Sequence, residues 1–259
     1  MTTGPVEKRV VVADTPAGLA QQVAGLLVRL LVSRTEEQRV AHIALTGGSM
    51  GGAVLRAAAE DPQVSEVDWS LVHFWWGDER FVALDDPDRN SLQSRQALLD
   101  RIPIPAANIH EVASPATGLS LDEAAEAYAD DLARFSSDEY PWPSFTVCFL
   151  GVGPDAHIAS LFPGRPEISV TDAAALPVRD SPKPPPERVT LTLPVLNSAE
   201  RVWLVLTGSD KAEALEGALT GTSHTSVPAA GAQGRDQTVF FADRAAAAKV
   251  RQEFMDRDY

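Results

Sequence analysis

The segment KRVVVADTPAGLAQQVAGLLVRLLVSRTEEQRVAHIALT, residues 8–46, contains two short β-rich runs separated by one long amphipathic stretch. The first run, KRVVVA, ends just before Thr15 and Pro16, which are residue types that favour a helix N-cap and a first helical position. Leucines and valines then recur at helical spacing until the second run, AHIALT. A strand, a helix and a strand in this order indicate an α/β fold with a parallel sheet.

The same alternation continues along the rest of the chain, and several of the β-rich runs are nearly continuous in apolar residues, as in strands covered on both faces. We expect strands at 8–13, 41–46, 70–76, 145–150, 188–193, 201–206 and 238–241. We expect helices at 14–34, 49–60, 90–100, 121–135, 209–219 and 242–255. The pattern predicts a doubly wound, largely parallel sheet of the Rossmann-like kind, with helices on both faces.

The organisation of the chain indicates one α/β domain over residues 1–259. The sequence shows no internal repeat and no clear linker. The segment PVRDSPKPPPERVT, residues 177–190, is dense in proline, but it is short and lies between expected elements. We therefore interpret it as an ordered loop and not as a domain boundary.

Composition narrows the classes of partner. The net charge is -14 and the sequence pI is about 4.7, which argues against nucleic acid or an anionic membrane as a partner. No apolar run approaches a membrane span and the N-terminus has no signal architecture, so we expect a cytoplasmic protein. Cys148 is the single cysteine and is interpreted as a small buried hydrophobe. An anionic ligand would need local attraction from a few cations or a helix N-terminus.

Ligands of doubly wound sheets bind outside the carboxyl ends of the strands, so the segments that follow the strands are the candidates for a site. In TGGSMGG, the residues Gly47, Gly48 and Ser49 stand between a strand and a helix, where backbone N–H groups and a hydroxyl can hold a phosphate. A glycine-eased turn with Ser49 as N-cap explains the same residues equally well.

The segment GDERFVALDDPDRNS places Asp78, Glu79 and Arg80 directly after an expected strand. Such an acidic cluster usually faces solvent or caps a helix, and Asp88 or Asn90 could cap the helix expected next. No histidine or cysteine stands at ligand spacing from these carboxylates, so we expect no metal there.

The segment GVGPDAHIASLFPG, residues 151–164, contains the histidine most suited to catalysis. Gly153 permits close approach of the backbone, and Asp155 stands two residues before His157, where it could orient the ring. If a helix begins near His157, its dipole favours the neutral imidazole, which is a competent general base. A histidine that only caps a helix is the alternative.

The other histidines and two cations complete the candidates. His42 and His73 fall within expected strands, where packing or a hydrogen bond is the simpler role, and His110 and His224 have no acidic or nucleophilic partner at motif spacing. Arg188 lies at the start of an expected strand and Lys211 in the first turn of an expected helix. Lys211 opposes that helix dipole, at a cost that an anionic ligand could offset, whereas an isolated arginine such as Arg188 commonly pairs with a surface carboxylate.

Four segments, LTGGS, WGDERFV, GVGPDAHIASLFPG and PPPERVTLTLPVLNSA, together resemble the family of 6-phosphogluconolactonases and glucosamine-6-phosphate deaminases over nearly the whole chain. The resemblance implies a mixed sheet flanked by helices, no metal or cofactor, and hydrolysis of the lactone of 6-phosphogluconate in the oxidative pentose phosphate pathway. It implies that His157 activates water beside Asp155. It further implies a site for the phosphate and the sugar, formed by Gly47, Gly48, Ser49, Asp78, Arg80, Gly153, Arg188 and Lys211.

Two features of the sequence bear on that resemblance. The family pattern Gly-x-Gly-x-Asp-Gly-His has Ala156 in place of its last glycine. The alanine costs about 1 to 2 kcal/mol if the position needs a positive φ, or its methyl group tightens the site if the position only needs to be close to the ligand. The deaminases are similar but carry an extra carboxylate after the histidine in an Asn-Glu-Pro context, where this chain has Phe162 before Pro163. The expected partner is thus a phosphorylated sugar lactone, bound by a monomer or small homo-oligomer.

A sugar-phosphate sensor without turnover is the alternative from another class, because fold does not fix function. Such a sensor normally works with a DNA-binding domain. This acidic chain has no spare basic helix-turn-helix segment. The sequence therefore favours the lactonase.

Overall fold

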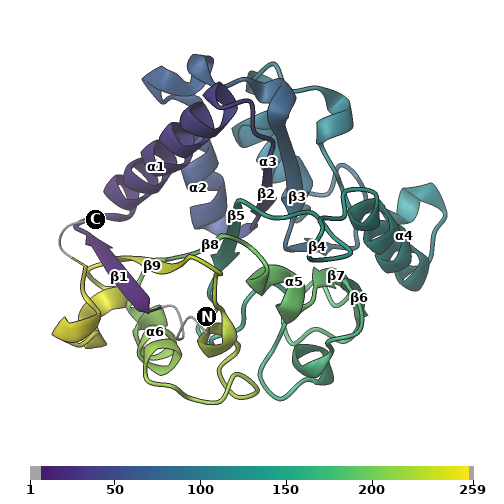
Figure 1. Cartoon of the computed structure of the whole chain (residues 1–259). Helices are drawn as coiled ribbons and strands as arrows, with labels where there is room; N and C mark the ends of the chain where they lie inside the picture. Colours follow the sequence, from purple (N-terminus) through teal and green to yellow (C-terminus); the bar gives the residue numbers. More distant parts are fainter. Residues whose placement is uncertain (1–6, 257–259) are drawn as a thin grey trace.

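The computed structural model describes residues 7–256. Its central feature is a parallel six-stranded sheet with the strand order β1-β9-β8-β5-β2-β3 (Figure 1). The strands are β1 Lys8–Ala13, β2 Ala41–Leu45, β3 Val72–Trp76, β5 Val147–Gly151, β8 Arg201–Leu206 and β9 Gln237–Asp243. The predicted doubly wound, mostly parallel sheet is confirmed. Residues 1–6, part of the N-terminal stretch considered above for a signal, lie outside the described range.

Helices cover both faces of this sheet, as Figure 1 shows for α1 and α2 on one side and α5 and α6 on the other. Along the central strand β5, Val147 and Phe149 belong to one buried cluster with α1, α2 and α3, while Cys148 and Leu150 belong to a second cluster with α4, α5 and α6. Alternate residues of a strand point to opposite faces, so each face has its own core. The helices are α1 Pro16–Glu36, α2 Gly48–Ala59, α3 Asn90–Ala97, α4 Leu121–Ala133, α5 Leu193–Asn197 and α6 Ala212–Leu219.

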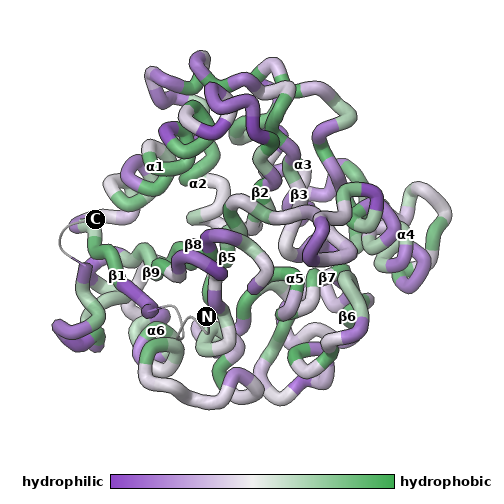
Figure 2. The backbone as a smooth tube through the Cα atoms, in the orientation of Figure 1, coloured by the Kyte–Doolittle hydropathy of each residue, from purple (hydrophilic) through white to green (hydrophobic). Residues whose placement is uncertain are grey.

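Helix α1 begins as its sequence indicates. The Thr15 hydroxyl accepts a hydrogen bond from the Gly18 N–H, and Pro16 is the first helical residue. Contrary to the expectation from sequence, α1 is long and apolar enough to cross a membrane by length and composition. Its side chains Val23, Leu27 and Leu31 are buried in the protein core, and Figure 2 shows hydrophobic and hydrophilic residues alternating along it. This is the pattern of a core helix in a folded domain.

A second, three-stranded antiparallel sheet lies beside the first. It contains β4 Asp78–Arg80, β7 Arg188–Leu191 and β6 Ala175–Val178, in the order β4-β7-β6. The strand expected at 188–193 therefore forms, but in this small sheet, and β4 and β6 were not anticipated. All four residues of β7 are buried, and a fully buried strand has the same apolar appearance in either kind of sheet. The register of β4 and β7 pairs Arg80 with Arg188.

The helix expected at 242–255 is wrong. Strand β9 continues to Asp243, whose carboxylate accepts hydrogen bonds from the N–H groups of Gly208 and Ala246. The chain then forms two short 3-10 turns, and the Asp256 N–H donates to the Val10 carbonyl on the edge strand β1. Tertiary hydrogen bonds thus override the helix propensity of the alanines. The 3-10 turns of the chain are Pro62–Glu66, Trp69–Leu71, Leu99–Arg101, Ala106–Asn108, Pro115–Thr117, Pro166–Ser169, Ser209–Lys211, Pro228–Gly231, Ala246–Lys249 and Gln252–Phe254.

Candidate active site

The segments that follow β2, β5 and β8 converge with the small sheet on one cavity of about 250 Å³. This is the edge of a parallel sheet at which ligands are expected. The cavity is lined by all the candidate residues except Asp155, which contacts one of them: Gly47, Gly48, Ser49, Asp78, Arg80, Gly153, His157, Arg188 and Lys211. The lining also includes Asn90, which the sequence suggested only as a helix cap, and Lys183, which it did not indicate.

His157 and Asp155 form a close pair, with 2.6 Å between Nδ1 and Oδ1. Burial alone raises the pKa of Asp155, but hydrogen bonds from His157 and Lys183 outweigh it and hold that pKa well below its usual range. An ionised carboxylate only accepts hydrogen bonds, so Nδ1 of His157 carries the proton and donates it. The lone pair is then on Nε2, the ring nitrogen left to a ligand in the cavity.

The expected helix near His157 is absent, because residues 152–163 form turns and isolated bridges between Val152, Ile158 and Leu161. No helix begins at His157, so the ring lacks the dipole expected from its own segment, and the alternative of a helix-capping histidine is wrong for the same reason. The carboxylate of Asp155 fixes the tautomer instead.

Position 153 needs a glycine because the side chains of His157 and Asp155 lie against its Cα atom. A Cβ added to it would stand 2.0 Å from Nδ1 of His157 and 2.5 Å from Oδ1 of Asp155. Ala156 has φ +64°, so the position that is glycine in the family pattern does adopt the left-handed region. Its side chain is buried in the core and does not line the cavity, so the extra methyl group changes the backbone energy and leaves the shape of the site unaltered.

The glycine loop after β2 presents the N-terminus of α2 to the cavity. Gly47 is the N-cap and Gly48 has φ +82°, so Ser49 lies in the first turn and is not the N-cap. The space beside Gly47 is filled by the amide of Asn90, since a Cβ there would come within 1.8 Å of Asn90 Oδ1. The first turn of α2 has no acidic residue, so its free N–H groups can hold an anion.

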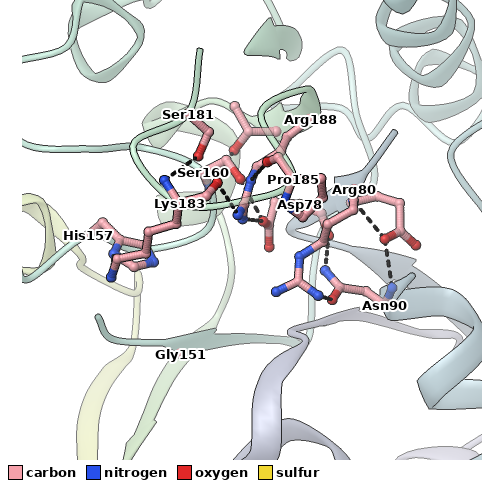
Figure 3. A network of polar contacts seen from close by, with 12 residues as sticks. Asp78, Arg80, Asn90, Gly151, His157, Ser160, Ser181, Lys183, Pro185 and Arg188 are labelled. Atoms are coloured by element: carbon pink, nitrogen blue, oxygen red, sulfur yellow. Dashed lines mark hydrogen bonds and ion pairs between the residues drawn. The ribbon is translucent and has the colours of Figure 1, made fainter. Parts of the chain in front are cut away.

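Asn90 orients Arg80. Its Nδ2 donates to the Asp78 carbonyl at 2.8 Å, and its Oδ1 accepts from Nη1 of Arg80 at 2.7 Å, as Figure 3 shows. The same Arg80 nitrogen donates to the Asp88 carbonyl, and Nε of Arg80 is buried without a partner in the described structure. Arg80 is therefore held in place while part of its donor capacity stays free.

Glu79 does not face solvent as the acidic cluster suggested. It is fully buried, and its carboxylate accepts hydrogen bonds from the N–H groups of Arg80, Asn90 and Ser91 at 2.7 to 2.8 Å. The Glu79 carboxylate thereby accepts hydrogen bonds from the free N–H groups at the start of α3. Neither Asp88 nor the side chain of Asn90 acts as the cap of that helix. Burial raises the pKa of Glu79, opposed by Arg89 and by these backbone donors.

The remaining cations differ in how they are held. Arg188 is 4% exposed and is not the surface residue that the simpler interpretation suggested. Lys211 ends a 3-10 turn just before α6 and forms an ion pair with Asp210 at 2.9 Å. Lys183 reaches the cavity from the proline-dense loop. The position of Lys183 among prolines could have suggested a fixed cation. No local sequence pattern, however, connects this lysine to His157.

A second histidine group lies away from the cavity. His73 Nδ1 is 3.0 Å from His110 Nε2, and His110 Nδ1 is 2.9 Å from Asp131 on α4, a partner 21 positions away. His42 accepts from the indole N–H of Trp75. Burial is the largest cause that lowers the pKa of all three histidines. Within residues 7–256, no group of three or more His, Cys, Asp or Glu side chains is arranged to hold a metal ion.

Comparison with known proteins identifies the family of the chain. The profile of the family described as glucosamine-6-phosphate isomerases/6-phosphogluconolactonase matches residues 14–241. A 6-phosphogluconolactonase from Streptomyces coelicolor is 43% identical over 236 residues, 90% of each chain. One from Mycobacterium tuberculosis is 46% identical over 212 residues, which are 81% of this chain and 85% of the relative.

Among solved structures, the 6-phosphogluconolactonase from Thermotoga maritima matches with a TM-score of 0.79 at 28% identity, covering 92% of this chain and 100% of that one. The sequence match and the structural match both extend over most of the chain. The chain therefore belongs to the glucosamine-6-phosphate isomerase/6-phosphogluconolactonase family.

Proposed function

We propose that the chain hydrolyses 6-phospho-D-glucono-1,5-lactone to 6-phosphogluconate, with His157 activating the attacking water. The lactonase activity, that of a carboxylic ester hydrolase, follows from the curated relatives named 6-phosphogluconolactonase. We place this activity in the oxidative pentose phosphate pathway. The role of His157 is our inference. The observation that carries it is the contact of Nδ1 with the ionised Asp155, which leaves Nε2 as a proton acceptor at the cavity.

The proposed reaction has two proton transfers. Nε2 takes a proton from water as the water oxygen bonds to the lactone carbonyl carbon, and the carbonyl oxygen becomes an oxyanion. The bond between that carbon and the ring oxygen then breaks, and the imidazolium returns its proton to the ring oxygen. Asp155 stabilises the intervening imidazolium because its carboxylate contacts Nδ1. Backbone N–H groups of the glycine loops would donate to the oxyanion.

The phosphate would bind to positive groups that this acidic chain concentrates in one place. Arg80, Lys183, Arg188 and Lys211 all line the cavity, beside the N-terminus of α2. The net charge of the whole chain is -14, so the cavity is a local concentration of positive charge on an acidic protein. A dianionic sugar phosphate is the kind of ligand that such a site attracts.

The test is His157→Asn, which keeps a polar side chain but removes the base. Acid release from freshly prepared lactone, measured above the spontaneous rate, should show kcat lower by about 10²- to 10⁴-fold with KM little changed. His224→Asn is the matched control, because His224 is exposed and lies outside the cavity. Near-normal turnover by His157→Asn would remove the ring from the mechanism.

The alternative of a sensor is distinguished by the same assay, since a sensor binds the phosphorylated ligand without accelerating acid release. We further propose that the enzyme acts in the cytoplasm as a monomer or small homo-oligomer. Gel filtration of the native protein tests the oligomeric state.

A further inference from the structure

The guanidinium of Arg188 is directed mainly at the protein backbone. Its Nη2 donates to the carbonyls of Lys183 and Pro184, both at 3.0 Å, and its Nε donates to the carbonyl of Pro185 at 3.1 Å. Its Nη1 lies 3.8 Å from Asp78 Oδ2. Three carbonyls of one loop therefore occupy most of the donors that a substrate phosphate would need.

The loop that Arg188 holds is the one that carries Lys183. Nζ of Lys183 lies 2.9 Å from Oδ1 of Asp155 and 3.2 Å from Nδ1 of His157. Figure 3 shows the lysine side chain extending to His157, with Arg188 to the right of Lys183. The Lys183 side chain is 37% exposed, so its position depends on the loop more than on packing around its tip.

Lys183 has two effects on the pair. It donates to the carboxylate of Asp155 and so holds it against Nδ1 of His157 when an anionic substrate enters. Its positive charge, 3.2 Å from the ring, also opposes the imidazolium that forms when Nε2 takes a proton.

We infer that Arg188 is a positioning residue: it fastens the loop so that Lys183 is held against the Asp155–His157 pair. Direct binding of the substrate phosphate, the role that the family resemblance suggested for Arg188, is secondary. This inference rests on the proposed role of His157 as the base. It assigns Lys183, which sequence reasoning missed, as the cation through which Arg188 acts.

A double-mutant cycle of Lys183→Met and Arg188→Lys tests the inference. Each single change should lower kcat/KM roughly tenfold, the size expected for one hydrogen bond to a charged group, and the double variant should match either single one. In each variant the acid limb of the pH–rate profile should move to higher pH, because a positive charge beside the ring is removed or displaced. Additive losses, near a hundredfold in the double variant, would overturn the inference.

Arg188→Lys keeps the charge, so a direct contact with the phosphate would chiefly raise KM and leave the acid limb in place. That result would also overturn the inference. Arg34→Lys and Lys249→Met are matched controls, because Arg34 pairs with Glu200 and Lys249 with Glu213 outside the cavity. Both controls should keep wild-type kinetics.

Amide hydrogen exchange gives a readout that does not depend on turnover. The Ser181 N–H donates to the Pro186 carbonyl across the loop at 3.0 Å, so its exchange should accelerate in Arg188→Lys and not in Lys183→Met. An unchanged exchange rate of the Ser181 N–H would refute the inference that Arg188 holds the loop in place. Should Arg188→Lys fail to fold, the change Lys183→Met at a partly exposed residue still tests the inference, since an unmoved acid limb refutes it. Normal turnover by His157→Asn would instead overturn the proposed function, with the exchange result unaffected.

Discussion

The change Gly153→Ala tests whether the position of the imidazole limits the reaction. The added Cβ would lie 2.0 Å from Nδ1 of His157, whereas ordinary van der Waals contact begins at 3.4 Å. The ring must therefore move by about 1.4 Å, from 2.0 Å to 3.4 Å, to restore an ordinary contact. It cannot keep its 2.6 Å contact with Asp155, because the Cβ also lies 2.5 Å from Oδ1 of that residue. Gly153 does not have a positive φ, so alanine itself brings no backbone strain.

A displacement of about 1 Å of a catalytic group can cost about 10² in rate, so we expect kcat of Gly153→Ala to fall by about 10²-fold or more. Initial rates of acid release measure kcat and KM, and thermal unfolding measures stability. The melting temperature should change little, because the new clash is with two side chains at the edge of a cavity.

Gly217→Ala is the matched control for this change. Gly217 lies in α6, and its added Cβ would meet Val227 at 3.5 Å, an ordinary contact. This variant should keep wild-type kinetics and gain about 0.5 to 1 kcal/mol in stability from its helical position. A kcat of Gly153→Ala within threefold of the wild type would refute the argument that the Asp155–His157 geometry sets the rate.

Three further predictions concern stability and binding. Folding lowers the pKa of His42 to about 3 and of His73 to about 4 from the ordinary histidine value of 6.5, so their contribution to stability is present above pH 6.5 and is lost as pH falls toward 3. The melting temperature should fall across that window, and less steeply in His42→Gln; parallel curves would contradict this. Ala156→Gly removes the strain of φ +64° but loses a buried methyl and adds unfolded-state entropy, terms of about 1 kcal/mol each, so denaturant unfolding should show a change within about 1 kcal/mol and kcat should be kept. A large stabilisation would mean that the strain dominates. Asn90→Ala releases Arg80 and should raise KM roughly tenfold with little change in kcat, and an unchanged KM would show that Arg80 does not need its amide partner.

The sequence predicted the parts of the molecule that depend on local pattern and on sheet geometry. The apolar runs identified the parallel strands, and Thr15 with Pro16 located the start of α1. Gly47, Arg80, His157 and Lys211 are distant in sequence, yet they meet because parallel strands end at one edge.

The remaining features arise from tertiary contacts that no local signal specifies. Lys183 acts on a histidine 26 positions before it, from a loop whose shape depends on hydrogen bonds to Arg188. Asn90 is merely the first residue of a helix until the fold places it against Arg80 and Gly47. The helix expected at 242–255 fails for the same reason, since pairing with β1 decides the backbone there.

The four cations of the cavity are not equivalent, and their partners indicate how the substrate is oriented. Lys183 and Lys211 each form an ion pair with a carboxylate, Asp155 and Asp210, so much of their charge is balanced. Arg80 is held by an amide and a backbone carbonyl, and no carboxylate in residues 7–256 forms an ion pair with it. Its charge is therefore the least compensated, and it lines the cavity with the N-terminus of α2. A phosphate dianion is attracted most strongly there.

Figure 3 shows Arg80 on the far side of Arg188 from His157. A phosphate bound at Arg80 leaves the neutral lactone carbonyl at the histidine end of the cavity, where a second anion would meet Asp155. Because Arg80 binds the phosphate and His157 acts at the lactone carbonyl, Asn90→Ala is expected to raise KM without a matching loss of kcat.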